Sequence, residues 1–189
     1  MGKTIGLFVL ITSFFFIAAV SVHADLIAGS SAAVAKNEQI STSAPSLSIQ
    51  QIALERKVIT EVLKKYDSPM VDNVDAFLQT CKSHELDCYL LPAIAGVEST
   101  FGKSIVSGTH NAFGWGRGLL AFKDFGDGIE TVGAGLKENY IDKGAHSIDA
   151  IGAIYCEGNT WADHVKYFMN MFHEEEKKQL FFVQDTVQL

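Results

Sequence analysis

The sequence predicts a mainly α-helical domain, on three observations. Apolar side chains recur at the three- and four-residue spacing of amphipathic helices in several separate stretches. Polar or glycine-rich segments separate these stretches, and only one short run, over residues 119–125, resembles the arm of a β-hairpin. The chain has 189 residues, of which 48% are hydrophobic, and this suffices for one compact domain. We therefore expect one helical domain over residues 49–178, with a small hairpin or loop lobe.

The first 48 residues are expected to serve export. A positive charge precedes an almost wholly apolar run over residues 4–20, and Val22 and Ala24 place small side chains where a signal peptidase cuts. We expect residues 1–24 to be a signal peptide, and residues 25–48, rich in Ala and Ser, to be a flexible linker. An uncleaved membrane anchor is the alternative, because the apolar run is nearly long enough to span a bilayer.

Two helices are expected before the middle of the chain. Apolar residues recur at helical spacing over residues 49–66, and Ser68 and Pro69 end that helix. A second helix is indicated by Val74, Phe77, Leu78 and Cys81.

The three cysteines allow one disulfide in an exported chain. Cys81 and Cys88 lie close together across a turn between two expected helices, so we prefer this pair. Either pairing with Cys156 stays formally possible. The spacing matches no zinc pattern, and a nucleophilic Cys156 would need a base partner that the sequence does not indicate.

Residues 90–103 are the stretch on which a functional hypothesis is based. As a helix, they place Glu98 on the same stripe as apolar side chains such as Leu91 and Ile94. A desolvated carboxyl has a raised pKa, and a protonated carboxyl is what a general acid needs. A structural carboxylate satisfied by an Arg or a backbone N–H is the alternative. Gly102 is expected to end the helix, so that Glu98 faces a loop.

The loop and the helices after it complete the domain. Residues 107–118, SGTHNAFGWGRG, are rich in glycine and aromatics, a composition that lets backbone and rings approach a ligand. Asp127 and Glu130 resemble a capping box that opens the next helix, which Gly144 ends. Two more helices are expected, one capped by Ser147 and one by Thr160. An apolar tail over residues 179–189 has no assigned place.

Three of these segments, taken in order, resemble the lysozyme-like glucosaminidase superfamily. They are DCYLLPAIAGVESTFGK at 87–103, NAFGWG at 111–116 and IYCEGNTWADHV at 154–165. The superfamily contains the endo-β-N-acetylglucosaminidases that cut bacterial cell-wall glycan, and it neighbours the soluble lytic transglycosylases. The resemblance covers about residues 71–172 and implies a lysozyme-like fold with a sugar-binding groove. The chain departs from the family at CEGNT, where related chains tend to have a Pro-containing loop.

Cleavage of a glycosidic bond needs a proton donor, and a group that stabilises or attacks the positively charged sugar ring. The resemblance implies Glu98 as the general acid. A second carboxylate is less clear, because Asp127 and Glu130 already have the capping explanation. Asp124 is the remaining candidate, and a solvated pair with Lys123 is its alternative. Family enzymes often use one essential Glu, and transglycosylases let a substrate hydroxyl attack.

The resemblance also implies contacts to the sugar. Tyr155 would lie near the acid, with a core tyrosine as the alternative. The expected substrate-binding residues are Ser99, His110, Asn111, Phe113 and Trp115. Each has a structural alternative: a helix end for Ser99, an exposed position for His110, and a packed loop for the other three. Trp161 is assigned to packing.

The expected protein is therefore an exported glycoside hydrolase that acts on β-1,4 bonds of N-acetylated aminosugar polymers such as peptidoglycan. No metal or organic cofactor is expected, and we expect a monomer that is secreted, periplasmic or cell-wall-associated. The formal charge of −7 argues against nonspecific nucleic-acid binding, which depends on basic patches. After signal cleavage no membrane contact is expected. A lytic transglycosylase and a noncatalytic glycan-binding module are the alternatives.

Overall fold

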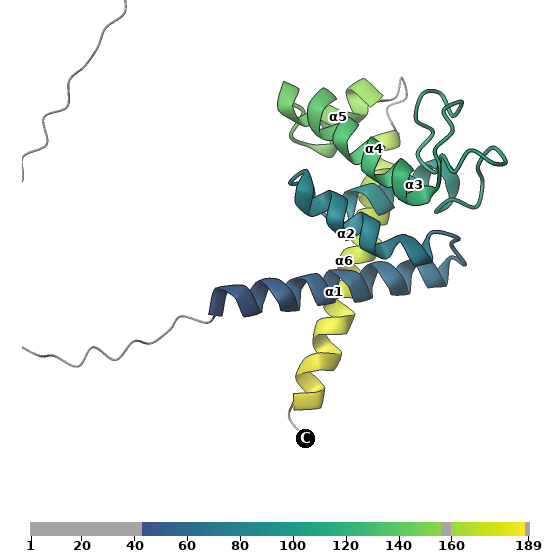
Figure 1. Ribbon diagram of the computed structural model, residues 1–189. Coiled ribbons are helices and arrows are strands. Elements are labelled where there is room, and N and C mark those ends of the chain that lie inside the picture. Colours follow the sequence, from purple (N-terminus) through teal and green to yellow (C-terminus); the bar gives the residue numbers. More distant parts are fainter. Residues whose placement is uncertain (1–42, 156–159, 188–189) are drawn as a thin grey trace, which may run out of the picture. The chain divides into compact units, whose positions relative to one another are not determined.

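The computed structural model describes residues 43–155 and 160–187, with side chains over residues 49–155 and 160–182. All regular elements among the described residues are helical, which confirms the mainly α prediction (Figure 1). In chain order they are α1 (Ser43–Lys65), η1 (Val71–Asn73), α2 (Val74–Ser83), α3 (Leu90–Ser99), α4 (Phe125–Asn139), η2 (Ile141–Lys143), α5 (Ile148–Tyr155) and α6 (Trp161–Val187).

Helix α3 lies at the centre of the domain. Its residues from Leu90 to Gly96 are all buried, as expected of a helix that is apolar on every side. It packs most extensively against α6, which also packs against α1. Fully buried rings and aliphatic chains from these helices, from α2 and α4, and from the loop after α3 form the core, chiefly Ile59, Leu63, Phe77, Leu91, Ile94, Phe101, Phe113, Ile129, Leu136 and Phe172.

The C-terminal end of α3 has an unusual backbone. The helix ends at Ser99, and Thr100, Phe101 and Gly102 follow with φ of 52°, 58° and 82°, all in the left-handed region. The helix therefore ends within the expected segment 99–102, but Thr100, rather than Gly102, is its left-handed C-cap. A left-handed conformation costs a non-glycine residue about 1–2 kcal/mol. Burial of the Phe101 ring, which contributes about 1.5–3 kcal/mol, offsets that cost.

The predicted hairpin arm over residues 119–125 is not found. Residues 119–124 have no regular secondary structure, and Phe125 begins α4. Two backbone hydrogen bonds join this run to the preceding loop, from Phe122 N–H to Thr109 O at 2.8 Å and from Leu119 N–H to Gly116 O at 3.3 Å. Among residues 119–124 only Phe122 is buried, whereas Leu119 is 82% exposed, so this stretch lacks the buried face that a strand needs.

The N-terminus of α4 lies earlier than the capping box predicted. Asp124 is the N-cap, and its Oδ1 accepts a hydrogen bond from Asp127 N–H at 2.9 Å. Asp127 in turn accepts from Lys123 N–H at 3.0 Å. Glu130 has another role, because it accepts from the Thr80 hydroxyl at 2.7 Å and lies 2.8 Å from His84 Nε2. The hydrogen bond with His84 is the main cause that lowers the pKa of Glu130.

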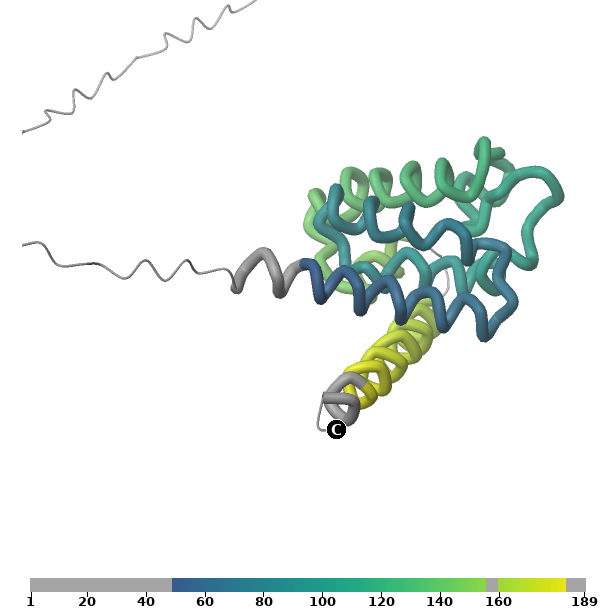
Figure 2. The backbone as a smooth tube through the Cα atoms, turned by 60° about the horizontal axis from the view of Figure 1, so that its bottom comes forward, coloured from purple at the N-terminus to yellow at the C-terminus, as the bar shows by residue number. Residues whose placement is uncertain are grey.

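The helices after α4 follow the prediction with two differences. Helix α4 ends at Asn139, and Gly144, at φ 99°, closes the short η2 that follows. Ser147 caps α5 as predicted, accepting from Ala150 N–H at 3.1 Å. Helix α6 then runs to Val187, across the boundary expected between residues 178 and 179. Its C-terminal part projects beyond the other helices (Figures 1 and 2) and exposes Phe181 and Phe182.

The expected signal peptide and most of the expected linker lie outside the described residues. Residues 43–48, which were assigned to the linker, form the first turns of α1. Within the described ranges, none of the helices is both long and apolar enough to cross a membrane.

The expected disulfide is present. Cys81 and Cys88 are bonded, with their Cα atoms 5.0 Å apart, and the bond closes the turn between α2 and α3. Cys156 lies outside the described residues.

Removal of this disulfide should destabilise the domain without changing its fold. The bond spans a separation of 7 residues. Closing a loop of this size reduces the entropy of the unfolded chain, which raises its free energy by about 2.5 kcal/mol. We expect the free energy of unfolding, measured with urea, to be lower by about this amount in a Cys81→Ala and Cys88→Ala double variant. The double variant should not respond to a reducing agent that destabilises the wild type. Equal stability of the two proteins would show that the bond does not constrain the unfolded chain.

Candidate functional site

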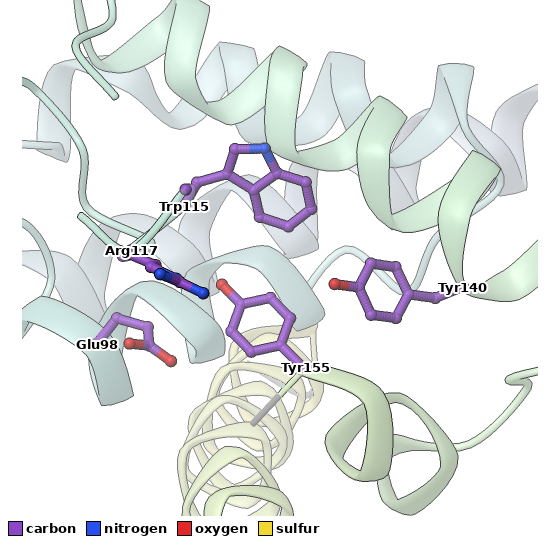
Figure 3. Close-up of a pocket in the computed structure, with 7 residues that line it drawn as sticks. Glu98, Trp115, Arg117, Tyr140 and Tyr155 are labelled. Carbon is purple, nitrogen blue, oxygen red and sulfur yellow. The ribbon is translucent and has the colours of Figure 1, made fainter. Parts of the chain in front are cut away.

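An open pocket with a cavity volume of about 490 Å³ lies at the C-terminal end of α3 (Figure 3). One wall is the glycine-rich loop after α3, and the other comes from the ends of α4 and α5. The lining residues are Glu98, Gly114, Trp115, Gly116, Arg117, Tyr140 and Tyr155. The structure therefore brings three predicted site residues, Glu98, Trp115 and Tyr155, to one pocket.

Glu98 supplies the carboxyl group of this pocket. It occupies the last turn of α3, where its side chain leaves the core and is only partly exposed. Its Oε1 accepts a hydrogen bond from the Trp161 indole N–H at 2.7 Å. Burial raises the pKa of Glu98, and the hydrogen bond from Trp161 opposes this rise in part. The carboxyl is thus held in one orientation while its neutral form is favoured.

An aromatic cluster contributes to both walls, with Trp115 on the loop and Tyr140 and Tyr155 at the ends of α4 and α5. The ring centroids of Trp115, Tyr140 and Tyr155 lie 6.0–6.4 Å apart in each pair. Tyr155 also stacks on Trp161, with ring centroids 4.7 Å apart. The ring cluster therefore includes the indole that donates a hydrogen bond to Glu98. The Tyr155 hydroxyl donates to Phe113 O at 2.6 Å and thereby ties α5 to the loop after α3.

Ser99 is a positioning residue for the loop. Its buried hydroxyl lies 2.7 Å from Ala112 O and 3.1 Å from Ala95 O, and it accepts from Gly102 N–H at 2.8 Å. The predicted contact with substrate is not seen, because the hydroxyl faces the backbone of the loop. Ser99 joins the end of α3 to the segment that carries Gly114 and Trp115.

Asn111 also shapes the loop from inside. Its side-chain amide donates to Trp115 O at 2.8 Å and to Leu120 O at 3.0 Å. Its carbonyl accepts from Trp115 N–H at 3.0 Å. Because the side chain is buried and both ends are engaged, Asn111 is not available to a sugar, and the predicted direct contact is replaced by support of Trp115.

The other predicted site residues lie outside the pocket lining. Phe113 is fully buried in the core. His110 has a left-handed backbone, with φ 50°, and its ring lies edge-on to Phe125 at 5.3 Å. Asp124 caps α4, so its carboxylate is already engaged and the structure does not bring it to Glu98.

Sequence reasoning missed five residues of the site. Trp161 is assigned to packing by its sequence pattern, and Tyr140 fits the apolar stripe of a helix. Gly114, Gly116 and Arg117 lie inside the glycine-rich loop, but the sequence gives them no role of their own. A backbone signal for Gly114 exists only in the structure: an added Cβ would come within 2.9 Å of Glu98 Oε2.

Among the residues with described side chains, no three His, Cys, Asp or Glu come together as a group that could hold a metal ion.

Comparison with known proteins does not assign the chain. No family model matches its sequence, and no curated protein matches it significantly. The function has to be inferred from the geometry of the pocket.

Gly114 and Gly118 allow a matched test of the contact with Glu98. Both have left-handed backbones, with φ of 62° and 75°, so an alanine at either costs about 1 kcal/mol of stability. Only at Gly114 does the new Cβ meet the Glu98 carboxylate, whereas nothing lies within 4 Å at Gly118. We expect Gly114→Ala alone to change the titration of the Glu98 carboxyl carbon in NMR. A changed titration in Gly118→Ala would refute the local contact.

Replacement of Glu98 by Gln should stabilise the protein at neutral pH. The folded-state pKa of Glu98 is raised, so its carboxyl contributes to the stability of the fold mainly when it is protonated. This contribution is complete below the unfolded-chain pKa, about 4.3, and is lost as pH rises through the folded-state pKa. The Gln variant cannot ionise and avoids this loss. Urea unfolding should show an advantage of Glu98→Gln that grows with pH across this window. An advantage independent of pH would contradict the raised pKa.

Proposed function

We propose that the protein is an exported peptidoglycan-cleaving endo-β-N-acetylglucosaminidase with Glu98 as its general acid. The observation that carries this proposal is a partly buried carboxyl of raised pKa, held by an indole N–H at the wall of an open pocket. Such a carboxyl stays protonated at higher pH than an exposed one, so it can protonate the oxygen of a leaving sugar.

The aromatic wall supports a sugar as the ligand. Pyranose rings present apolar C–H faces, and the rings of Trp115 and the two tyrosines offer matching surfaces. The pocket is open rather than enclosed, which suits a segment of a long polymer better than a small metabolite.

The mechanism we propose relies on one carboxyl group. Glu98 is the only acidic residue among those that line the described pocket. It would donate its proton to the glycosidic oxygen as the bond to the ring carbon breaks. The oxocarbenium-like ring would then be captured either by water, giving a hydrolase, or by a hydroxyl or amide of the substrate itself.

Export is supported by the disulfide as well as by the apolar N-terminal sequence. A bond between Cys81 and Cys88 persists in an oxidising compartment, where a cell-wall enzyme works. We propose a secreted, periplasmic or cell-wall-associated location on these grounds.

Replacement of Glu98 by Gln should abolish release of soluble fragments from purified peptidoglycan. Loss of a general acid lowers the rate by about a hundredfold to ten-thousandfold. Glu61→Gln is the matched control, because Glu61 is an exposed carboxylate on α1, which contributes no residue to the pocket. Products would be analysed by mass spectrometry.

The products distinguish the possible functions. Fragments with reducing ends from the wild type and from Glu61→Gln would support the hydrolase. Anhydro ends would move the protein to the lytic transglycosylases, which favours capture by the substrate's own hydroxyl. Undiminished activity of Glu98→Gln would refute the assignment of the acid. Binding without any fragments would favour a noncatalytic glycan-binding module.

A further inference from the structure

We infer that Arg117 makes the pocket selective for glycans that carry a carboxylate close to the bond in the site. The inference rests on the proposed function, because it specifies which strands of peptidoglycan that same pocket prefers. These are strands whose lactyl carboxyl is free, since a stem peptide converts this carboxyl into an uncharged amide. It concerns specificity and gives Arg117 no part in the chemical step.

Arg117 is the only cationic side chain that lines the described pocket. Figure 3 shows its guanidinium directed into the space that Glu98 and Tyr155 also face. The chain as a whole has a formal charge of −7, so a positive group at this position contrasts with the rest of the protein. When Glu98 is protonated, Arg117 gives the pocket a net positive charge.

The guanidinium has no carboxylate partner among the described residues. The chain's other arginine, Arg56, is paired with Asp75. Glu98 lines the same pocket, but its carboxyl accepts a hydrogen bond from Trp161 and does not lie within ion-pair distance of Arg117. An arginine that served to hold the Glu98 carboxylate would make that contact. Its donors therefore point at space that a ligand can occupy.

The backbone at Arg117 favours glycine over any side chain. Its φ is 61°, and it stands between Gly116 and Gly118, with φ of 61° and 75°. A side-chain-bearing residue in this conformation is less stable than glycine. The Arg117 side chain is exposed and packs into no core, so burial does not offset the cost. Strain of this kind at a pocket indicates a functional side chain.

The ligand group that fits best is a carboxylate. The planar guanidinium binds carboxylates through two parallel hydrogen bonds, which gives orientation as well as charge recognition. A sugar stacked on the aromatic wall would place an acidic ring substituent toward Arg117. An uncharged aminosugar polymer of the same length lacks this contact.

The test compares two soluble probes with the same sugar backbone, of which one carries negative charge at its lactyl groups and the other does not. One is a tetrasaccharide of alternating N-acetylglucosamine and N-acetylmuramic acid with free lactyl carboxylates, and the other is the same tetrasaccharide with those carboxyls converted to methylamides. Affinities would be measured by calorimetry on full-length Glu98→Gln protein, which binds without turnover. We expect the acidic probe to bind about tenfold more tightly, and higher salt to reduce this ratio.

Arg117→Gly should remove the preference, because it deletes the charge while relaxing the backbone. The acidic probe should lose about tenfold in affinity, and the methylamide should change by less than about twofold. Arg117→Lys should retain part of the preference, since it keeps the charge but not the paired donors. Lys123→Gln is the matched control, because Lys123 is an exposed cation of the same loop outside the pocket lining.

Several outcomes would overturn the inference. They are equal affinity of the two probes for the protein, no binding of the acidic probe, equal weakening of both probes in Arg117→Gly, and loss of the preference in Lys123→Gln. Unfolding curves establish that each variant is folded. Failure of the proposed function is distinguishable, because it would appear as absent glycan cleavage with the charge preference intact.

Discussion

The pocket depends on the buried hydroxyl of Ser99, which holds the loop after α3 against the helix that carries Glu98. Without its bonds to Ala112 O and Gly102 N–H, two left-handed residues would have to end the helix with less support. The hydroxyl and the acid are neighbours in sequence but point in different directions. One side chain fixes the loop and the other faces the cavity, so a two-residue unit sets the distance between the acid and the pocket wall.

Along the loop after α3, some residues are likewise buried and others line the cavity. Buried residues determine its shape: Asn111 bonds both sides of Trp115, and Phe113 anchors the chain in the core. The residues between and after them line the cavity, namely Gly114, Trp115, Gly116 and Arg117. Residues 111–117 thus contain both the buried side chains that shape the loop and the side chains that line the cavity. Asn111 belongs to the buried set.

Sequence periodicity predicted the helices well because each buries one apolar face, and the Glu98 position followed from the same stripe. It did not separate roles within the loop, because an asparagine that binds a sugar and one that braces a turn have the same neighbours in sequence. The role of Trp161 was missed because an indole on an apolar stripe predicts packing. The hydrogen bond from its N–H to Glu98 joins residues 63 positions apart, a distance over which local sequence patterns give no information. The hairpin prediction failed since a short apolar run carries no information on whether a partner strand exists.

The placement of the aromatic residues has a practical consequence for spectroscopy. The chain contains two tryptophans, and both belong to the site: Trp115 lines the cavity, and Trp161 bonds the Glu98 carboxyl. The tryptophan emission of the protein therefore originates at the site, with no background from indoles elsewhere. The native chain is its own optical reporter of ligand occupancy and of the ionisation of the acid, with no attached dye.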